Sequence, residues 1–213
     1  MSVDNPGLRR RPVQRRSIDR VGRILDACAR RLDEVGLDAL TTADVARSAG
    51  VPSGTIYQFF DGKAGMLREL ALRNLGLLLE RLRRRTAEEP ELTWPRAAEL
   101  VLAETVEMRR TVPGFTVVDF ADTRPGGVSF LPEGTVKESG DVLAERLYRF
   151  ALEEAGLPPL PDPYRVMRLA IQATAAVLQL AFTAAPGGDP AMIEQGRRLL
   201  RAYFVDTASE TFR

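Results

Sequence analysis

The stretch TTADVARSAGVPSGTIYQFFDGK, from Thr41 to Lys63, decides the fold of this 213-residue chain. Thr41 with Asp44 three residues later is a capping-box pattern, which predicts the start of a short helix. Ala49-Gly50-Val51-Pro52 then predicts a tight break, after which a second short helix follows. Two short helices joined by a tight turn that contains glycine form a helix-turn-helix, which we predict over residues 41–60.

The two short helices divide their residues between a small core and an outer surface. The apolar residues are placed to pack with Leu25 and Leu40, and they are Val45, Ala46, Ile56 and Phe60. The polar residues are left facing outward, and they are Thr42, Ser53, Thr55, Tyr57 and Gln58. Short or planar polar groups of this kind suit phosphate oxygens and base edges.

Helical periodicity continues on both sides of this motif, with no alternating run that would indicate a strand. We expect a first helix near 18–35 and a long fourth helix near 64–85. Further helices are expected near 94–110, 115–122, 137–155, 163–184 and 190–211. The predicted fold class is all-α, with about nine helices.

Three segments of different character divide the chain. Residues 1–16 are polar and basic and contain two prolines, which predicts a flexible arm. Residues 17–77 hold the three-helix domain with the helix-turn-helix, and residues 78–213 form a C-terminal helical domain. Nine arginines and two aspartates lie between Leu8 and Arg31, so this window carries +7 in a chain of net charge +1. A strongly basic N-terminal segment is typical of a surface that binds a polyanion such as a nucleic acid. A solvent-exposed tail without a partner has the same composition.

The residue types that are missing narrow the function. The chain has no histidine and one cysteine, Cys28, which excludes histidine-based acid–base catalysis and internal disulfides. No glycine-rich phosphate loop is present, so we expect no enzyme, no metal site and no cofactor. Cys28 is predicted to be a small buried hydrophobe, and the absence of disulfides and of an apolar signal region is typical of a cytoplasmic protein.

Residues 169–188 carry no charge and imitate a membrane span. The stretch is mostly alanine, and Gln172, Thr174, Gln179 and Thr183 interrupt it, which opposes insertion into a bilayer. We therefore expect no membrane contact, but a buried helix of a soluble protein that needs a partner surface.

The run from Arg23 to Leu70 resembles the DNA-binding domain of the TetR family of bacterial regulators. The features that carry the resemblance are Ile24-Leu25 with Ala27, Glu34-x-Gly36, Leu40-Thr41-x-x-Asp44-Val45-Ala46, Ala49-Gly50-Val51, and Gly54-Thr55-Ile56-Tyr57 with Phe60 and Lys63. Two positions depart from the family pattern. Phe59 stands where histidine or tyrosine is usual, and Ser53 stands where a longer basic residue is common.

The resemblance implies a role in DNA binding for seven residues. Thr42 would contact a phosphate or a base edge, and Ser53, Gly54 and Thr55 would enter the major groove. Tyr57 and Lys63 would bind phosphates, and Gln58 would pair with adenine. The arginine-rich arm would add affinity by lying along phosphates or in the minor groove.

The resemblance also implies that the C-terminal helices bind a ligand and form a homodimer through the last two helices. The residues expected at the dimer interface are Ala176, Ile193, Gly196, Leu200 and Tyr203. The alternative is that both helices lie inside a monomeric core.

A ligand pocket is expected among the fifth to eighth helices. Its candidate lining is Trp94, Met108, Phe115, Val118, Asp119, Phe150, Met167, Ile171, Gln172 and Gln179, with Thr174 as a further polar anchor. Aromatic and methionine residues at helical spacing also suit an ordinary core.

The sequence thus predicts a regulator that binds an inverted-repeat operator in double-stranded DNA, as a repressor released by an unknown small-molecule ligand. Two alternatives remain open at this point. One is a helical carrier or partner-binding protein with a degenerate helix-turn-helix, and the other is a DNA-binding regulator without a small-molecule effector.

Overall fold

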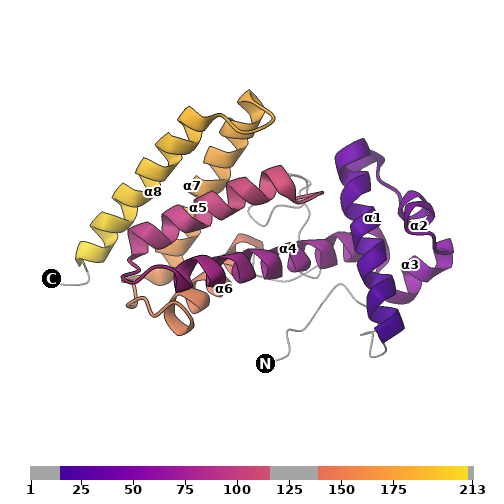
Figure 1. Ribbon diagram of the computed structural model, residues 1–213, viewed down its shortest axis with the longest axis horizontal. Helices are drawn as coiled ribbons and strands as arrows, with labels where there is room; N and C mark the ends of the chain where they lie inside the picture. Colours follow the sequence, from indigo (N-terminus) through magenta and orange to yellow (C-terminus); the bar gives the residue numbers. More distant parts are fainter. Residues whose placement is uncertain (1–14, 116–138, 211–213) are drawn as a thin grey trace. The chain divides into compact units, whose positions relative to one another are not determined.

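The computed structural model describes residues 15–115 and 139–210, with side chains for residues 16–115 and 142–207. Within these ranges the chain forms α-helices and no β-strand (Figure 1). The helices are α1 (Arg15–Ala39), α2 (Thr42–Ala49), α3 (Ser53–Phe59), α4 (Gly62–Ala87), α5 (Trp94–Thr111), α6 (Ser139–Glu153), α7 (Pro163–Ala184) and α8 (Pro190–Glu210). The all-α fold class is confirmed. The helix expected at 115–122 and the arm at 1–16 lie almost wholly outside the described residues.

Two compact units make up the chain. The first unit comprises Met1–Leu75 and Thr111–Ser139, and the second comprises Gly76–Arg110 and Gly140–Arg213. α4 begins in the first unit and ends in the second, because its residues 62–75 and 76–87 belong to different units. The domain boundary expected after residue 77 stays a prediction, and the return of the chain to the first unit after Thr111 was not foreseen.

The core of the first unit forms where α1, α2 and α3 pack together. Ile24, Val45, Ile56 and Phe60 are all fully buried there. Cys28 is also buried, and burial raises the pKa of its thiol to about 12, so it is the inert small hydrophobe that the sequence predicts. Gly36, predicted to end the first helix, has φ 75° and ψ 173° and interrupts α1 three residues before its end.

The segment after α5 packs on α1 within the first unit. The N–H of Gly114 donates to Oδ1 of Asp33 at 2.9 Å, and Phe115 is 1% exposed. Gly114 has φ +71°, and a Cβ built on it would lie 2.9 Å from Cα of Ala29. Only glycine permits both this backbone conformation and this close approach.

In the second unit, three aromatic rings stack in parallel. Trp94 of α5 stacks with Tyr148 of α6 and with Phe204 of α8, at ring-centroid distances of 5.9 and 5.8 Å. The indole N–H of Trp94 donates to the carbonyl of Pro158 at 2.8 Å. The stack therefore joins three helices and the connection between α6 and α7 around one side chain.

α7 is buried on one face and exposed on the other. Residues such as Ala170, Ile171 and Leu178 are buried, whereas Leu169 and Leu180 are each 56% exposed. By length and composition α7 is apolar enough to cross a membrane, a property that core helices of soluble proteins share. The buried face of α7 is already covered within the chain. The partner surface that the sequence predicts is therefore needed only for the exposed face.

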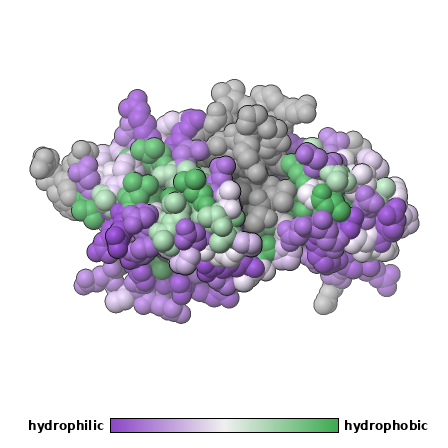
Figure 2. Space-filling model, turned by 90° about the horizontal axis from the view of Figure 1, so that it is seen from above, coloured by the Kyte–Doolittle hydropathy of each residue, from purple (hydrophilic) through white to green (hydrophobic). Residues whose placement is uncertain are grey.

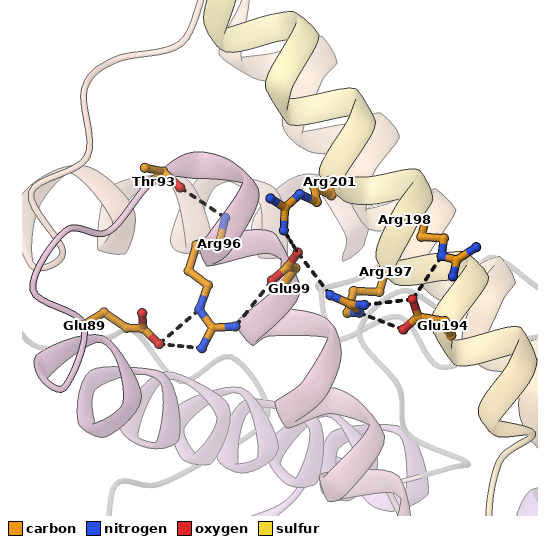
Figure 3. A network of polar contacts seen from close by, with 8 residues as sticks. All are labelled: Glu89, Thr93, Arg96, Glu99, Glu194, Arg197, Arg198 and Arg201. Atoms are coloured by element: carbon orange, nitrogen blue, oxygen red, sulfur yellow. Dashed lines mark hydrogen bonds and ion pairs between the residues drawn. The ribbon is translucent and has the colours of Figure 1, made fainter.

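A network of ion pairs joins α8 to α5 and to the chain before it (Figure 3). Its centre is the carboxylate of Glu99, whose side chain is 7% exposed. Arg96, Arg197 and Arg201 approach this carboxylate at 3.3, 3.6 and 3.2 Å. Around it, Arg96 also binds Glu89, and Glu194 binds Arg197 and Arg198.

Candidate nucleic-acid interface and ligand cavity

The start of α2 is fixed by a side-chain cap. Oγ1 of Thr41 accepts a hydrogen bond from the N–H of Asp44 at 3.1 Å and donates to Oδ2 of Asp44 at 2.6 Å. The Thr41 hydroxyl and Arg47 both stabilise the ionised carboxylate and lower the pKa of Asp44. Thr41 therefore caps α2 through its side chain, and Thr42 lies in the first turn of this helix.

The turn between α2 and α3 depends on one glycine. Gly50 adopts φ 65° and ψ 38°, the left-handed conformation that ends many helices. The N–H of Gly50 donates to the carbonyl of Arg47, and the N–H of Val51 donates to the carbonyl of Ala46, at 3.2 and 3.0 Å. These bonds set the angle at which α3 leaves α2.

α3 presents most of its predicted contact residues to solvent. Ser53, Gly54, Tyr57 and Gln58 are exposed, and Tyr57 is 50% exposed. Its inner face consists of Thr55, Ile56 and Phe59, which are all buried.

The expectation that Thr55 faces outward is wrong. Thr55 is only 8% exposed, because it lies one turn before the buried Phe59 on the same side of a helix of seven residues. The neighbouring departure from the family pattern, Phe59, is an inner packing residue at 7% exposure.

Two of the predicted DNA-binding residues hydrogen-bond to one another. The hydroxyl oxygens of Thr42 on α2 and Tyr57 on α3 lie 3.0 Å apart. Because both side chains reach solvent, this pair forms a hydroxyl site across the two helices.

Lys63, in the first turn of α4, bonds inside the protein. Its Nζ donates to the carbonyl of Leu37 at 2.6 Å, which ties α4 to the end of α1. An ammonium has three donors, so this bond leaves capacity for a phosphate. The DNA contact predicted for Lys63 stays a prediction.

The second unit holds an apolar cavity that opens to solvent and is lined by residues from α4 to α8 and from the connections between them. Its empty space, including the part open to solvent, is about 620 Å³. Four predicted pocket residues line it, namely Trp94, Phe150, Met167 and Ile171, together with Thr174. Sequence analysis missed the small residues that make the room, such as Ala98, Ala151 and Ala170. An alanine inside a helix carries no signal of its own, because it suits any helix.

Other pocket predictions need correction. Met108 is fully buried in α5 and does not line the cavity, and Phe115 belongs to the first unit. Gln172 is half-buried and Gln179 is exposed, so the face of α7 that carries them turns away from the cavity. Val118 and Asp119 lie outside the described residues.

Two of the residues expected at the dimer interface are buried within the chain. Leu200 is 2% exposed and lines the cavity. Gly196 is buried where α7 and α8 cross, and a Cβ built on it would lie 2.3 Å from Cγ1 of Val177. Ala176 is exposed, and Ile193 and Tyr203 are half-buried, so for these three the prediction stays open.

Two family models match most of the chain. The family model described as "Bacterial regulatory proteins, tetR family" matches residues 24–70, and the model "Tetracyclin repressor-like, C-terminal domain" matches residues 92–208. The HTH-type transcriptional regulator BetI 1 of Chromohalobacter salexigens is 36% identical over 89 residues, which is 40% of this chain and only 41% of that relative.

Solved structures agree with the family models. A TetR-family transcriptional regulator from Streptomyces coelicolor is 40% identical, with a TM-score of 0.74 over 88% of this chain and 99% of that one. FadR of Bacillus subtilis, solved with stearoyl-CoA, is 15% identical with a TM-score of 0.60, over 86% and 97% of the two chains, and it shows likeness of fold alone. Since the two family models cover most of the sequence and the helix-turn-helix is present, this chain belongs to the TetR family of bacterial transcriptional regulators, which bind DNA through that motif.

Proposed function

We propose that the chain is a cytoplasmic, homodimeric repressor that binds an inverted-repeat operator and leaves it when a small molecule binds the second unit. The observation that carries the proposal is the exposed polar surface of α2 and α3, held in place by the buried core beneath it. Thr42, Tyr57 and Gln58 project from helices whose inner residues Val45, Ile56 and Phe59 are buried. A rigid support of this kind positions polar groups for phosphates and base edges.

Each residue of this surface takes a role that its chemistry suits. Ser53 and Gly54 enter the major groove, and Gln58 donates to and accepts from adenine. Thr42 and Tyr57 bind a phosphate oxygen through their paired hydroxyls, and Lys63 adds a positive charge. Thr55 is buried, so we assign it to the support of α3.

The homodimer is supported by the open faces of α7 and α8. Large apolar residues are more than half exposed there, namely Leu169, Leu180, Leu199 and Val205. Figure 2 shows hydrophobic residues gathered on the surface of the second unit. A second copy that covers these faces through a two-fold axis would remove them from water and would make the operator an inverted repeat.

The coupling of ligand to DNA is supported by the course of α4. One end of this helix carries Lys63, and the other carries Leu82 and Thr86, which line the cavity. A ligand that prefers one position of α4 shifts the population toward that position. The spacing of the two recognition helices then no longer fits successive major grooves, about 34–36 Å apart.

The testing experiment is selection of random duplex DNA by the purified full-length protein at moderate salt. We expect enrichment of an inverted repeat, since a two-fold dimer reads two half-sites. Salt-sensitive binding without an enriched motif, or no binding, would contradict the proposal and favour a carrier with a degenerate helix-turn-helix. Sedimentation of the free protein at the same concentration measures the dimer separately.

A further inference from the structure

The cavity of the second unit is lined almost entirely by hydrocarbon. No charged side chain lines it within the described residues, and the lining side chains there that carry an N–H or O–H are those of Thr86, Thr174 and Trp94. Small side chains leave the space open, since larger ones at the same positions would fill it. These residues are Ala97, Ala98, Ala151, Ala155 and Ala170. Whether a polar ligand can bind in the cavity therefore depends on whether these few polar groups have hydrogen-bond donors left for it.

Each of the three polar groups already donates its hydrogen inside the chain. The Thr86 hydroxyl donates to the carbonyl of Leu82 at 2.9 Å, and that of Thr174 donates to the carbonyl of Ala170 at 2.8 Å. The Trp94 indole N–H donates to the carbonyl of Pro158 at 2.8 Å. A carbonyl, ether or carboxylate oxygen that entered would lose its hydrogen bonds to water and find no free donor on these side chains.

Three arginines that neighbour cavity-lining residues in the sequence are held in ion pairs. Arg83, whose guanidinium lies 5.8 Å from the ring centroid of Phe150, makes a two-pronged ion pair with Glu154. Arg85, next to Thr86, binds Glu104 at 3.1 Å, and Arg96, next to Ala97, binds Glu89 at 2.6 Å. An anionic group at this rim would have to compete with a carboxylate, and a cationic group would have to displace a guanidinium.

We propose that the ligand of this cavity is an uncharged, predominantly hydrocarbon molecule, a straight or cyclic apolar compound with at most a neutral polar group left at the rim. The inference rests on the proposed function, because it names the chemical class of the small molecule that would release the protein from DNA. It rejects the polar anchors Gln172 and Gln179, which do not line the cavity. It also rejects a cationic ligand.

The chain carries its own probe for the test, because Trp94 is its single tryptophan and lines the cavity. Full-length protein is titrated with 1-decanol, decanoate and decyltrimethylammonium, which share one hydrocarbon chain and differ in charge. We expect 1-decanol to shift the Trp94 emission and to bind at least tenfold more tightly than either charged compound. Equal or tighter binding of a charged compound, or no response to 1-decanol, overturns the inference.

A matched pair of variants on α5 locates the binding. Ala98→Leu fills the cavity from a half-buried position and is expected to weaken 1-decanol at least tenfold. Ala103→Leu makes the same change at an exposed position and is expected to leave binding unaltered. Thermal unfolding of both variants verifies that they fold. Equal effects of the two variants would place 1-decanol outside the cavity and overturn the inference.

The two proposals fail in different measurements. The Trp94 titration alone decides the ligand class, and DNA selection alone decides the operator. If 1-decanol binds in the cavity but leaves affinity for the selected DNA unchanged, the ligand class stands and release by effector fails. If no operator is enriched, the proposed function fails, and the titration still decides what the cavity accepts.

Discussion

The hydroxyl oxygens of Thr42 and Tyr57 lie 3.0 Å apart, fifteen residues apart in the sequence and on different helices. The tight turn at Gly50 brings them together, and the buried residues behind α3 hold them at the surface. A shared hydrogen bond leaves each oxygen with acceptor capacity and the pair with one hydrogen to donate outward. That hydrogen is the group that a phosphate oxygen would accept.

Tyr57→Phe removes this hydroxyl and is expected to weaken binding to the selected operator about tenfold or more. A hydrogen bond to a charged group contributes about 1.5–3 kcal/mol, and each 1.4 kcal/mol is a factor of about ten. The slope of affinity against salt is expected to stay the same, because no charge is lost. Tyr164→Phe, the same change at a 54% exposed tyrosine of α7, is the control. Equal affinity of the two variants would remove Tyr57 from the interface.

Gly50→Ala is expected to lower the free energy of unfolding by about 1–2 kcal/mol. The added Cβ meets nothing within 4 Å, so the whole effect comes from the left-handed backbone at φ +65°. Gly22→Ala, inside α1 and also in open space, is expected to do the opposite and add roughly 0.5–1 kcal/mol. Thermal and urea unfolding measure both changes. A stable Gly50→Ala protein with unchanged DNA affinity would show that the turn tolerates other conformations.

The DNA-binding unit was largely predictable, because its signals are local. A capping threonine, a glycine at a left-handed position and an apolar stripe each act within a few residues. Thr55 shows the limit of this reasoning. Whether a polar residue beside Ile56 faces inward depends on the rotation of a short helix against its neighbours, which spacing alone does not fix.

The second unit was less predictable, because its features arise between distant segments. Leu200 and Gly196 were expected at the surface of a dimer and are buried instead, against the cavity and Val177. Helical spacing identified an apolar face on α8, but an apolar face does not reveal whether its partner is the same chain or a second copy. Gln172 and Gln179 were misplaced for the same reason.

Glu99→Gln is expected to destabilise the protein by about 1–3 kcal/mol. Removing one partner of a fully buried ion pair costs about 3–5 kcal/mol. We expect a smaller loss of stability here because the three arginine side chains are 44–62% exposed and water screens their charges. Without the carboxylate, three guanidiniums repel one another. Glu91→Gln, at an exposed carboxylate, is the control. The difference between the variants is expected to shrink in high salt, and a difference that does not respond to salt would argue against charge as the cause.

The pH dependence of stability tests the outer part of the same network. Hydrogen bonds from Arg197 and Arg198 lower the pKa of Glu194 from 4.5 to about 2. A depressed pKa means that this group stabilises the fold above about pH 4.5 and that its contribution is lost as the pH falls toward 2. Thermal unfolding between pH 6 and 2 is expected to show wild type and Glu194→Gln converging at the acid end. A constant gap between the two curves would place the effect elsewhere.

Gly196→Ala is expected to destabilise the second unit by about 1–3 kcal/mol through overpacking. The new Cβ would lie 2.3 and 2.9 Å from the two γ-carbons of Val177, and the β-branched valine has few rotamers in a helix through which to withdraw. α7 and α8 must then separate, which also alters the faces that we propose for the dimer. Val177→Ala in the same chain removes both γ-carbons, so the double variant is expected to recover stability relative to the sum of the single changes. Gly187→Ala, in open space between the two helices, is the control. Urea unfolding measures the coupling energy between the two substitutions, and sedimentation measures the fraction of dimer. Additive effects of the two substitutions would show that α7 and α8 pack less tightly at this crossing than the contact implies.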